Sequence, residues 1–117
     1  MPDFTASRSI AAGGLDDRPL ANWKYRQLPA SPSGRWAVSI MQRATAVGAF
    51  ETISAGAQEI KQKSNIHAGG TAGTTPIPQT TPVIQFFASP LDEVVISNDN
   101  PTAGAITVDT YVNVEPA

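Results

Sequence analysis

Apolar and polar residues alternate most regularly near the end of the chain, over residues 106–115. Side chains two positions apart lie on the same face of a strand, so this alternation predicts a strand with one buried face. The series that would be buried is Ile106, Val108, Thr110, Val112 and Val114. Residues 35–42 show the same period, with Trp36, Val38 and Ile40 in one series, and predict a second strand.

Three further segments predict strands. Residues 83–88 and 92–97 are short apolar runs, and the second ends at Asn98-Asp99-Asn100-Pro101, a strong turn signal. Residues 21–29 carry two aromatic residues, Trp23 and Tyr25, at alternate positions, which fits a strand with a half-buried aromatic face.

The middle of the chain is less regular. Residues 44–54 fit either a strand or a short helix, because their alanines favour a helix. Residues 57–63 are mostly polar and predict an exposed edge strand, in which Lys61 and Lys63 would discourage pairing with another sheet edge.

Two segments lack the side chains that build a core. Residues 1–20 are small and polar, and we expect an extended arm that is ordered only where something else holds it. Residues 68–82 are rich in Gly, Pro and Thr and predict a long loop.

Seven or eight short strands separated by turns, with no clear helix, are typical of an antiparallel β-sandwich or a small barrel. We therefore predict a single all-β domain, a jelly-roll-like antiparallel sandwich over 21–117, preceded by the arm at 1–20.

Composition excludes several functions. The 117 residues contain no Cys, one His, and 8 Lys and Arg against 10 Asp and Glu, for a net charge of -2. Disulfides, thiolate zinc sites and Cys nucleophiles are therefore excluded, and a multi-histidine metal site cannot form within one chain. The slightly acidic charge balance also argues against nucleic-acid binding, which normally shows a basic patch or stripe. No run of 18 apolar residues occurs, so we expect no membrane-spanning helix.

Candidate chemistry is sparse, and each motif has a simpler structural interpretation. His67, with Ser64 three residues earlier, lacks the nucleophile elbow of a hydrolase. The glycine-rich run 68–73 lacks the Lys and the following helix of a phosphate-binding loop. The acidic pairs Asp16-Asp17 and Asp92-Glu93, and the Asp99 turn, lack calcium-loop spacing. We predict no enzyme, no catalytic residues, no metal site and no cofactor.

Several short runs resemble small bacteriophage virion proteins, the cysteine-free β-sandwich proteins that decorate, cement or plug capsids. The runs are Arg18–Tyr25 (RPLANWKY), His67–Gly73 (HAGGTAG), Asp92–Asn98 (DEVVISN) and Ala105–Asp109 (AITVD). The resemblance implies a capsid-associated or vertex protein that works as a homo-oligomer. Its partners would be identical subunits and a major capsid protein, within a virion assembled in the host cytoplasm.

Low charge and many small residues suit a surface that packs against identical neighbours. We expect the protein contacts in the arm, in the 68–82 loop and at exposed strand edges. The residues predicted for the arm and the loop are Phe4, Ile10, Leu15, Arg18, Thr71, Thr74, Thr75 and Ile77.

A second hypothesis is a carbohydrate-binding or other ligand-binding sandwich module. Trp23, Tyr25 and Trp36 could form an aromatic platform for a ligand, although aromatic residues in small sandwiches are more often part of the core. This hypothesis requires at least one of the three rings to be exposed.

Overall fold

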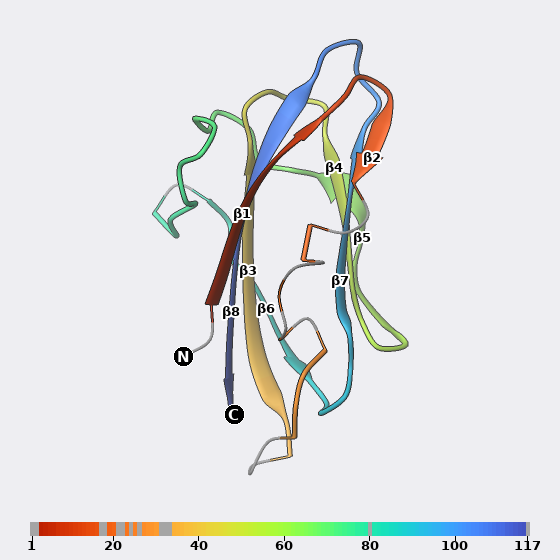
Figure 1. Cartoon of the computed structure of the whole chain (residues 1–117), viewed down its shortest axis with the longest axis vertical. Coiled ribbons are helices and arrows are strands. Elements are labelled where there is room, and N and C mark those ends of the chain that lie inside the picture. Colours follow the sequence, from red (N-terminus) through yellow and green to blue (C-terminus); the bar gives the residue numbers. More distant parts are fainter. Residues whose placement is uncertain are drawn as a thin grey trace.

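The computed structural model describes residues 3–16, 19, 20, 23, 25, 27–30, 34–79 and 81–116. Antiparallel strands form two packed four-stranded sheets, which confirms the predicted all-β sandwich (Figure 1). The eight strands are β1 (Asp3–Ile10), β2 (Gly14–Asp16), β3 (Trp36–Ala44), β4 (Phe50–Ala55), β5 (Gln58–Asn65), β6 (Ile84–Ala88), β7 (Val94–Asn100) and β8 (Ile106–Pro116).

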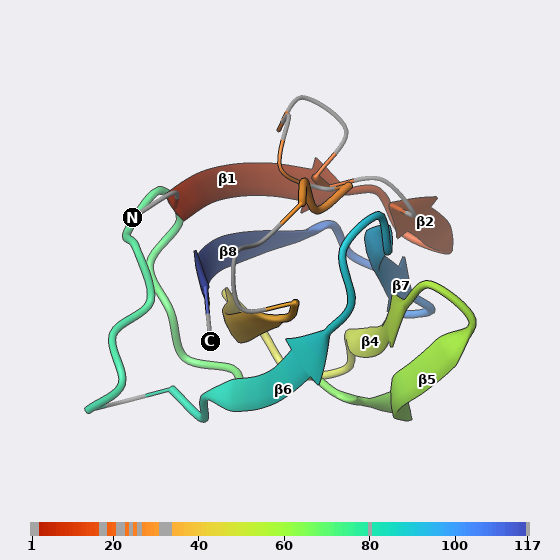
Figure 2. The same cartoon turned by 90° about the horizontal axis from the view of Figure 1, so that it is seen from below.

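The strand pairs are nested along the chain. Strand β1 pairs with β8, β2 with β7, β3 with β6 and β4 with β5. Sheet A has the order β1-β8-β3-β6 and sheet B the order β2-β7-β4-β5. This is a long hairpin wrapped into two sheets, the arrangement of a jelly roll. Figure 2 shows β1 and β2 along one side of the sandwich and β5 and β6 along the other.

Two apolar clusters fill the space between the sheets. The large apolar cluster contains inward residues from both sheets together with Leu20, Trp23 and Leu28 from the segment between β2 and β3. The small apolar cluster lies toward the opposite end of the strands and contains Ile10, Ala44, Ala49, Ile66, Ile106 and Val108.

The clearest alternating segments form the strands predicted for them. Strand β3 buries Trp36, Val38 and Ile40, and β8 buries the series from Ile106 to Val114. The ambiguous segment 44–54 contains no helix: β3 ends at Ala44 and β4 begins at Phe50. The predicted edge strand is β5, which pairs only with β4.

Two predictions about local structure were wrong. The described part of 21–29 is not a strand, and its only ladder contact is a single bridge from Gln27 to Glu93. Trp23 and Leu28 instead turn inward and enter the large apolar cluster. The predicted turn at 98–100 belongs to β7, because Asn98 and Asn100 are buried and hydrogen-bonded inside the sandwich. The bend follows at 102–104.

Most of the predicted arm is built into the two sheets. Residues 3–10 pair with β8 at eight successive positions, and residues 14–16 pair with β7. An ion pair of 2.8 Å between Arg8 and Asp16 joins the two strands across the edge of the sandwich. The chain itself therefore orders these residues, through backbone pairing that a sparse apolar pattern does not reveal.

Candidate functional site

A layer of buried polar side chains separates the two apolar clusters. Gln42 of β3 and Thr110 of β8 come from sheet A, whereas Glu51 of β4 and Asn98 of β7 come from sheet B. All four are at most 3% exposed. We call them, together with Lys61 of β5, the polar layer.

Gln42 is the centre of the polar layer. Its Nε2 donates to Glu51 Oε1 and to Asn98 Oδ1, both at 3.0 Å. Its Oε1 accepts from Asn98 Nδ2 and from Thr110 Oγ1, both at 2.8 Å. The carboxamide of Gln42 thus has its full set of partners, as a buried amide requires.

Lys61 completes the layer from the edge of sheet B. Its Nζ lies 2.6 Å from Glu51 Oε2, and the Lys61 side chain is 32% exposed against 4% for Glu51. The pairing of β4 with β5 shifts between Glu51 and Ile53, and again between Ile53 and Ser54. Such bulges re-aim side chains. Here Lys61 lies opposite the inward residue Ile53, and its ammonium reaches Glu51.

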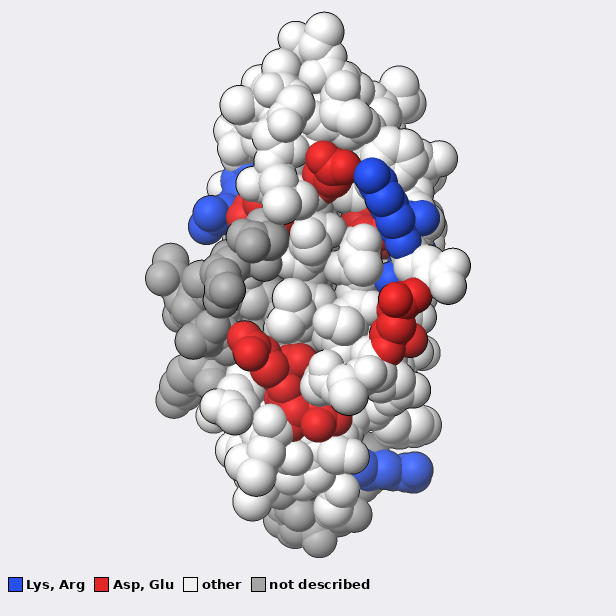
Figure 3. All heavy atoms as spheres, turned by 90° about the vertical axis from the view of Figure 1, so that its right-hand side faces the viewer, with Lys and Arg blue, Asp and Glu red and all other residues white. Residues whose placement is uncertain are grey.

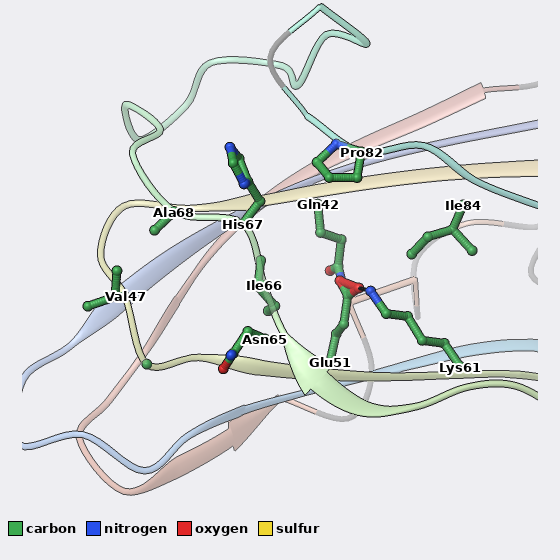
Figure 4. Close-up of a pocket in the computed structure, with 11 residues that line it drawn as sticks. Gln42, Val47, Glu51, Lys61, Asn65, Ile66, His67, Ala68, Pro82 and Ile84 are labelled. Atoms are coloured by element: carbon green, nitrogen blue, oxygen red, sulfur yellow. Dashed lines mark hydrogen bonds and ion pairs between the residues drawn. The ribbon is translucent and has the colours of Figure 1, made fainter.

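A cleft of about 390 Å³ opens beside the polar layer, on the side where β5 and β6 form the two sheet edges. Figure 4 shows Gln42, Glu51 and Lys61 meeting at one wall, with His67 and Pro82 across from them. The full lining is Gln42, Val47, Gly48, Glu51, Lys61, Asn65, Ile66, His67, Ala68, Pro82 and Ile84. Apolar and polar side chains are therefore mixed around a space large enough for a small molecule.

The cleft is close to electrically neutral, because Lys61 and Glu51 compensate each other. The Lys61 ammonium has further N–H donors beyond the one used on Glu51. The Asn65 and His67 side chains are exposed at the rim and add donor and acceptor groups. The geometry favours a neutral ligand with hydroxyl or carbonyl groups over a charged one.

The structure does not join His67 and Ser64 into a catalytic pair. Ser64 Oγ donates to the carbonyl of Gln62 at 2.9 Å, and the carbonyl of His67 accepts from Ala44 N at 2.8 Å. Within the described residues, no three His, Asp or Glu side chains gather as metal ligands would.

The glycine-rich loop and the acidic motifs have structural partners. Gly70 N donates to the carbonyl of Ala44 at 3.0 Å, and Gly73 N donates to Asp109 Oδ1 at 3.1 Å. These bonds hold the loop against the outer face of sheet A. Asp92 Oδ2 accepts from Ser89 N at 3.1 Å and stabilises the turn between β6 and β7.

The predicted aromatic platform is mostly interior. Trp23 and Trp36 are each 6% exposed, and Tyr25 is half-buried. Trp23 stacks on Phe4 at 5.7 Å between ring centroids, and Trp36 Nε1 donates to the carbonyl of Pro29 at 2.8 Å. The two tryptophans therefore present little surface to a ligand.

The residues predicted for protein contacts differ in accessibility. Leu15 is 63% and Ile77 50% exposed, Phe4 is half-buried, and Ile10 is 3% exposed in the small apolar cluster. The three loop threonines, Thr71, Thr74 and Thr75, are exposed. Arg18 lies outside the described residues.

Charged side chains are scattered over the face that Figure 3 shows, in small acidic and basic groups separated by uncharged surface. On sheet B, Lys63 and Asp99 form an ion pair of 3.0 Å. No broad basic surface is visible on this face. No helix within the described residues has the length and apolar character needed to cross a membrane.

The fold defines the chain as a jelly-roll β-sandwich with a polar layer and a side cleft. No family model, curated protein or solved structure matches it. The polar layer and the cleft were not among the sequence-based candidates. The sequence contains a signal for the polar layer: Gln42, Asn98 and Thr110 are polar residues that occupy the same alternating positions as the buried apolar residues of their strands.

Proposed function

We propose that the chain is a structural subunit of a bacteriophage virion, which acts through contacts with copies of itself and with a major capsid protein. The observation that carries the proposal is a run of exposed large apolar side chains over residues 77–91. Of the six such side chains among the described residues, four lie in this run: Ile77, Val83, Phe87 and Leu91. We call these four the apolar strip.

The apolar strip follows the edge strand β6 and its two flanking connections. Phe87 is 56% exposed, and the Arg35 guanidinium lies 4.3 Å from its ring centroid. Leu91 is 72% exposed and has a φ of 71°, a left-handed conformation that is costly for a branched apolar residue. Exposed apolar side chains that form a contiguous patch mark protein contact surfaces, and these four follow one another along the chain on β6 and its flanking connections.

The fold is compatible with this proposal, and the sequence resemblance favours it. Jelly rolls occur in viral capsid proteins and also in lectin domains, so the fold alone supports either role. The resemblance of four short sequence runs to small virion proteins favours the first.

If the proposal holds, the genome that encodes the chain is that of a phage, and the test uses this phage. Peptide mass spectrometry of gradient-purified virions is expected to find the chain at a constant ratio to the major capsid protein. Recombinant chain should also sediment with particles that lack it, and Phe87→Ser combined with Val83→Ser should weaken this binding at least tenfold. Val47→Ser, at a residue 79% exposed but outside the apolar strip, is the matched control. Absence of the chain from purified virions would overturn the proposal.

A second candidate function is ligand binding, and the cleft beside the polar layer favours it. If this function holds, the ligand contacts Lys61 and the rim residues Asn65 and His67, whereas Trp23 and Trp36 stay in the core. Titration of the chain with neutral mono- and disaccharides, followed by NMR, should then shift amide signals around the cleft. Lys61→Met should abolish those shifts. A spectrum that no sugar changes would reject this candidate.

A further inference from the structure

The four sheet edges of the sandwich differ in how well they are protected against pairing with another strand. Unpaired edges bind other strands unless they are short, bulged, charged or interrupted by proline. Strand β2 has three residues, and β6 has five and lies between Pro82 and Pro90. Strand β5 has two register shifts and carries Lys61 and Lys63. These three edges are protected.

Strand β1 is less protected: its charged residues are Asp3 near its start and Arg8, which is paired with Asp16. It runs for eight residues, contains no proline or lysine, and pairs with β8 in an unbroken register. Its residues Asp3, Thr5, Ser7, Arg8 and Ser9 are exposed. Figure 2 shows β1 at the outer end of sheet A, beyond β8.

The described part of the loop between β5 and β6 contacts β1 from the outer face of sheet A. Residues 73–76 lie beside Thr5, Ala6 and Ser7 around a small hollow of about 100 Å³. The hollow also includes Asp109, whose carboxylate holds the loop on the outer face of sheet A. The free N–H and C=O groups of an edge strand point within the plane of the sheet, so a loop on its face does not satisfy them.

We propose that β1 pairs antiparallel with β1 of a second copy, so that two A sheets join into one eight-stranded sheet across a two-fold axis. We assign the pairing strand to a second copy of the chain. A two-fold axis lets the backbone N–H and C=O groups of one β1 edge bond to those of the identical edge, with the same surface on both sides of the contact. The proposal deepens the proposed function by naming the contact between copies, and its biological meaning rests on that function.

The sequence of β1 selects the register. A two-fold axis normal to the sheet keeps each side chain on its own face, so residues opposite each other are both odd-numbered or both even-numbered. With the axis at Ala6, Asp3 lies opposite Ser9, Phe4 opposite Arg8, and Thr5 opposite Ser7. No like charges meet, and the smallest side chain of the strand lies on the axis. Opposed Thr–Ser pairs are favourable cross-strand contacts.

The absence of cysteine makes this register directly testable by single cysteine substitutions. Residues opposite each other in an antiparallel pair have Cα atoms about 4.5–5.5 Å apart, within the range that a disulfide spans, whereas diagonal neighbours are about 7–8 Å apart. Under mild oxidation, Ala6→Cys should therefore form a covalent dimer. Thr5→Cys and Ser7→Cys should each form no covalent dimer alone and should form a mixed covalent dimer when combined.

Light scattering behind a sizing column gives a second readout on the unmodified chain. We expect a dimer, which Ala6→Lys converts to a monomer because two ammonium groups would meet on the axis. Gln85→Lys, on the exposed edge strand β6, is the matched control and should leave the dimer intact. Thermal unfolding of each variant checks that it is folded.

The results separate this inference from the proposed function. A monomeric chain, with no mixed Thr5→Cys and Ser7→Cys dimer, would overturn the β1 pairing and leave the virion role standing. Equal cross-linking of all three single cysteines would also overturn it, because it would reflect collision without register. Absence from virions together with a dimer cross-linked at Ala6 would overturn only the virion role.

Discussion

The ammonium of Lys61 lies 2.6 Å from a carboxylate oxygen of Glu51, in a contact where only the lysine reaches solvent. Glu51 is 3% exposed and its other oxygen accepts from Gln42. The buried carboxylate therefore depends on an edge-strand lysine for its counter-charge, and this dependence can be measured.

Lys61→Met should destabilise the fold by about 2 kcal/mol, because it leaves the Glu51 carboxylate buried without its cation. The partial exposure of Lys61 keeps the cost below that of a fully buried pair. Lys63→Met is the matched control on the same strand, since its ion pair with Asp99 is exposed and should contribute about 0.5 kcal/mol or less. Urea unfolding at neutral pH measures both. Equal losses in the two variants would contradict the expectation.

Asn100→Ala should cost about 2–4 kcal/mol, because several hydrogen bonds of a fully buried carboxamide are lost together. Asn100 Nδ2 donates to the carbonyls of Ile10 at 3.0 Å and Gly104 at 2.8 Å, and its Oδ1 accepts from Thr102 Oγ1 at 2.6 Å. Asn113→Ala, at a half-buried position on the outer face of β8, should cost less than 1 kcal/mol and serves as the control. Hydrogen exchange should show faster opening at the Ile10 end of β1 in Asn100→Ala alone.

Gly48→Ala should destabilise the chain by about 2–3 kcal/mol, for two separable reasons. The φ of Gly48 is +108°, and an added Cβ would lie 2.5 Å from Thr102 Cγ2. In a Thr102→Ser background, which removes this methyl group and keeps the hydroxyl, the cost should fall to about 1 kcal/mol, the part due to φ. Gly104→Ala, where an added Cβ meets no atom within 4 Å, is the control. The expectation fails if Thr102→Ser does not reduce the cost.

Tryptophan fluorescence should report two shielded rings. Trp23 and Trp36 are each 6% exposed, so the emission should be blue-shifted and acrylamide should quench it several-fold less than free tryptophan. Trp23→Phe and Trp36→Phe separate the two contributions. Efficient quenching in either single-tryptophan variant would show that its remaining tryptophan lies at the surface, where it could contact a ligand.

The sequence predicts the strands that alternate cleanly. In β3 and β8, apolar side chains at every second position face one interior, and this periodicity is visible without any tertiary information. The long loop after β5 is predicted equally well from the sequence, because its Gly, Pro and Thr residues cannot build a core.

The remaining elements depend on partners far away in the sequence. Strand β1 has few apolar residues, and backbone pairing with β8 about a hundred positions later orders it. Residues 21–29 have a strand-like pattern, but their aromatic and leucine side chains fill the open side of the sandwich instead. Asn98 and Asn100 are typical turn residues by composition, whereas in the fold they are paired with neighbouring strands and held by buried side-chain hydrogen bonds in β7.

The candidate site escaped prediction for a related reason. Gln42 and Glu51 are polar residues of ordinary strands, and nothing in their immediate surroundings predicts that they meet across two sheets. Polar residues in phase with a buried apolar series are the available signal, and Gln42 follows Trp36, Val38 and Ile40 in this way.

The polar layer has a consequence for how the two sheets are aligned. Contact between apolar faces is non-directional, so such faces tolerate sliding by a fraction of a side chain. The hydrogen bonds from Gln42 to Glu51 and Asn98 are directional. Any slip between the sheets would leave buried donors and acceptors without partners, at a cost of about 1–3 kcal/mol each. The layer therefore fixes the position of one sheet relative to the other, so that every folded molecule has the same outline.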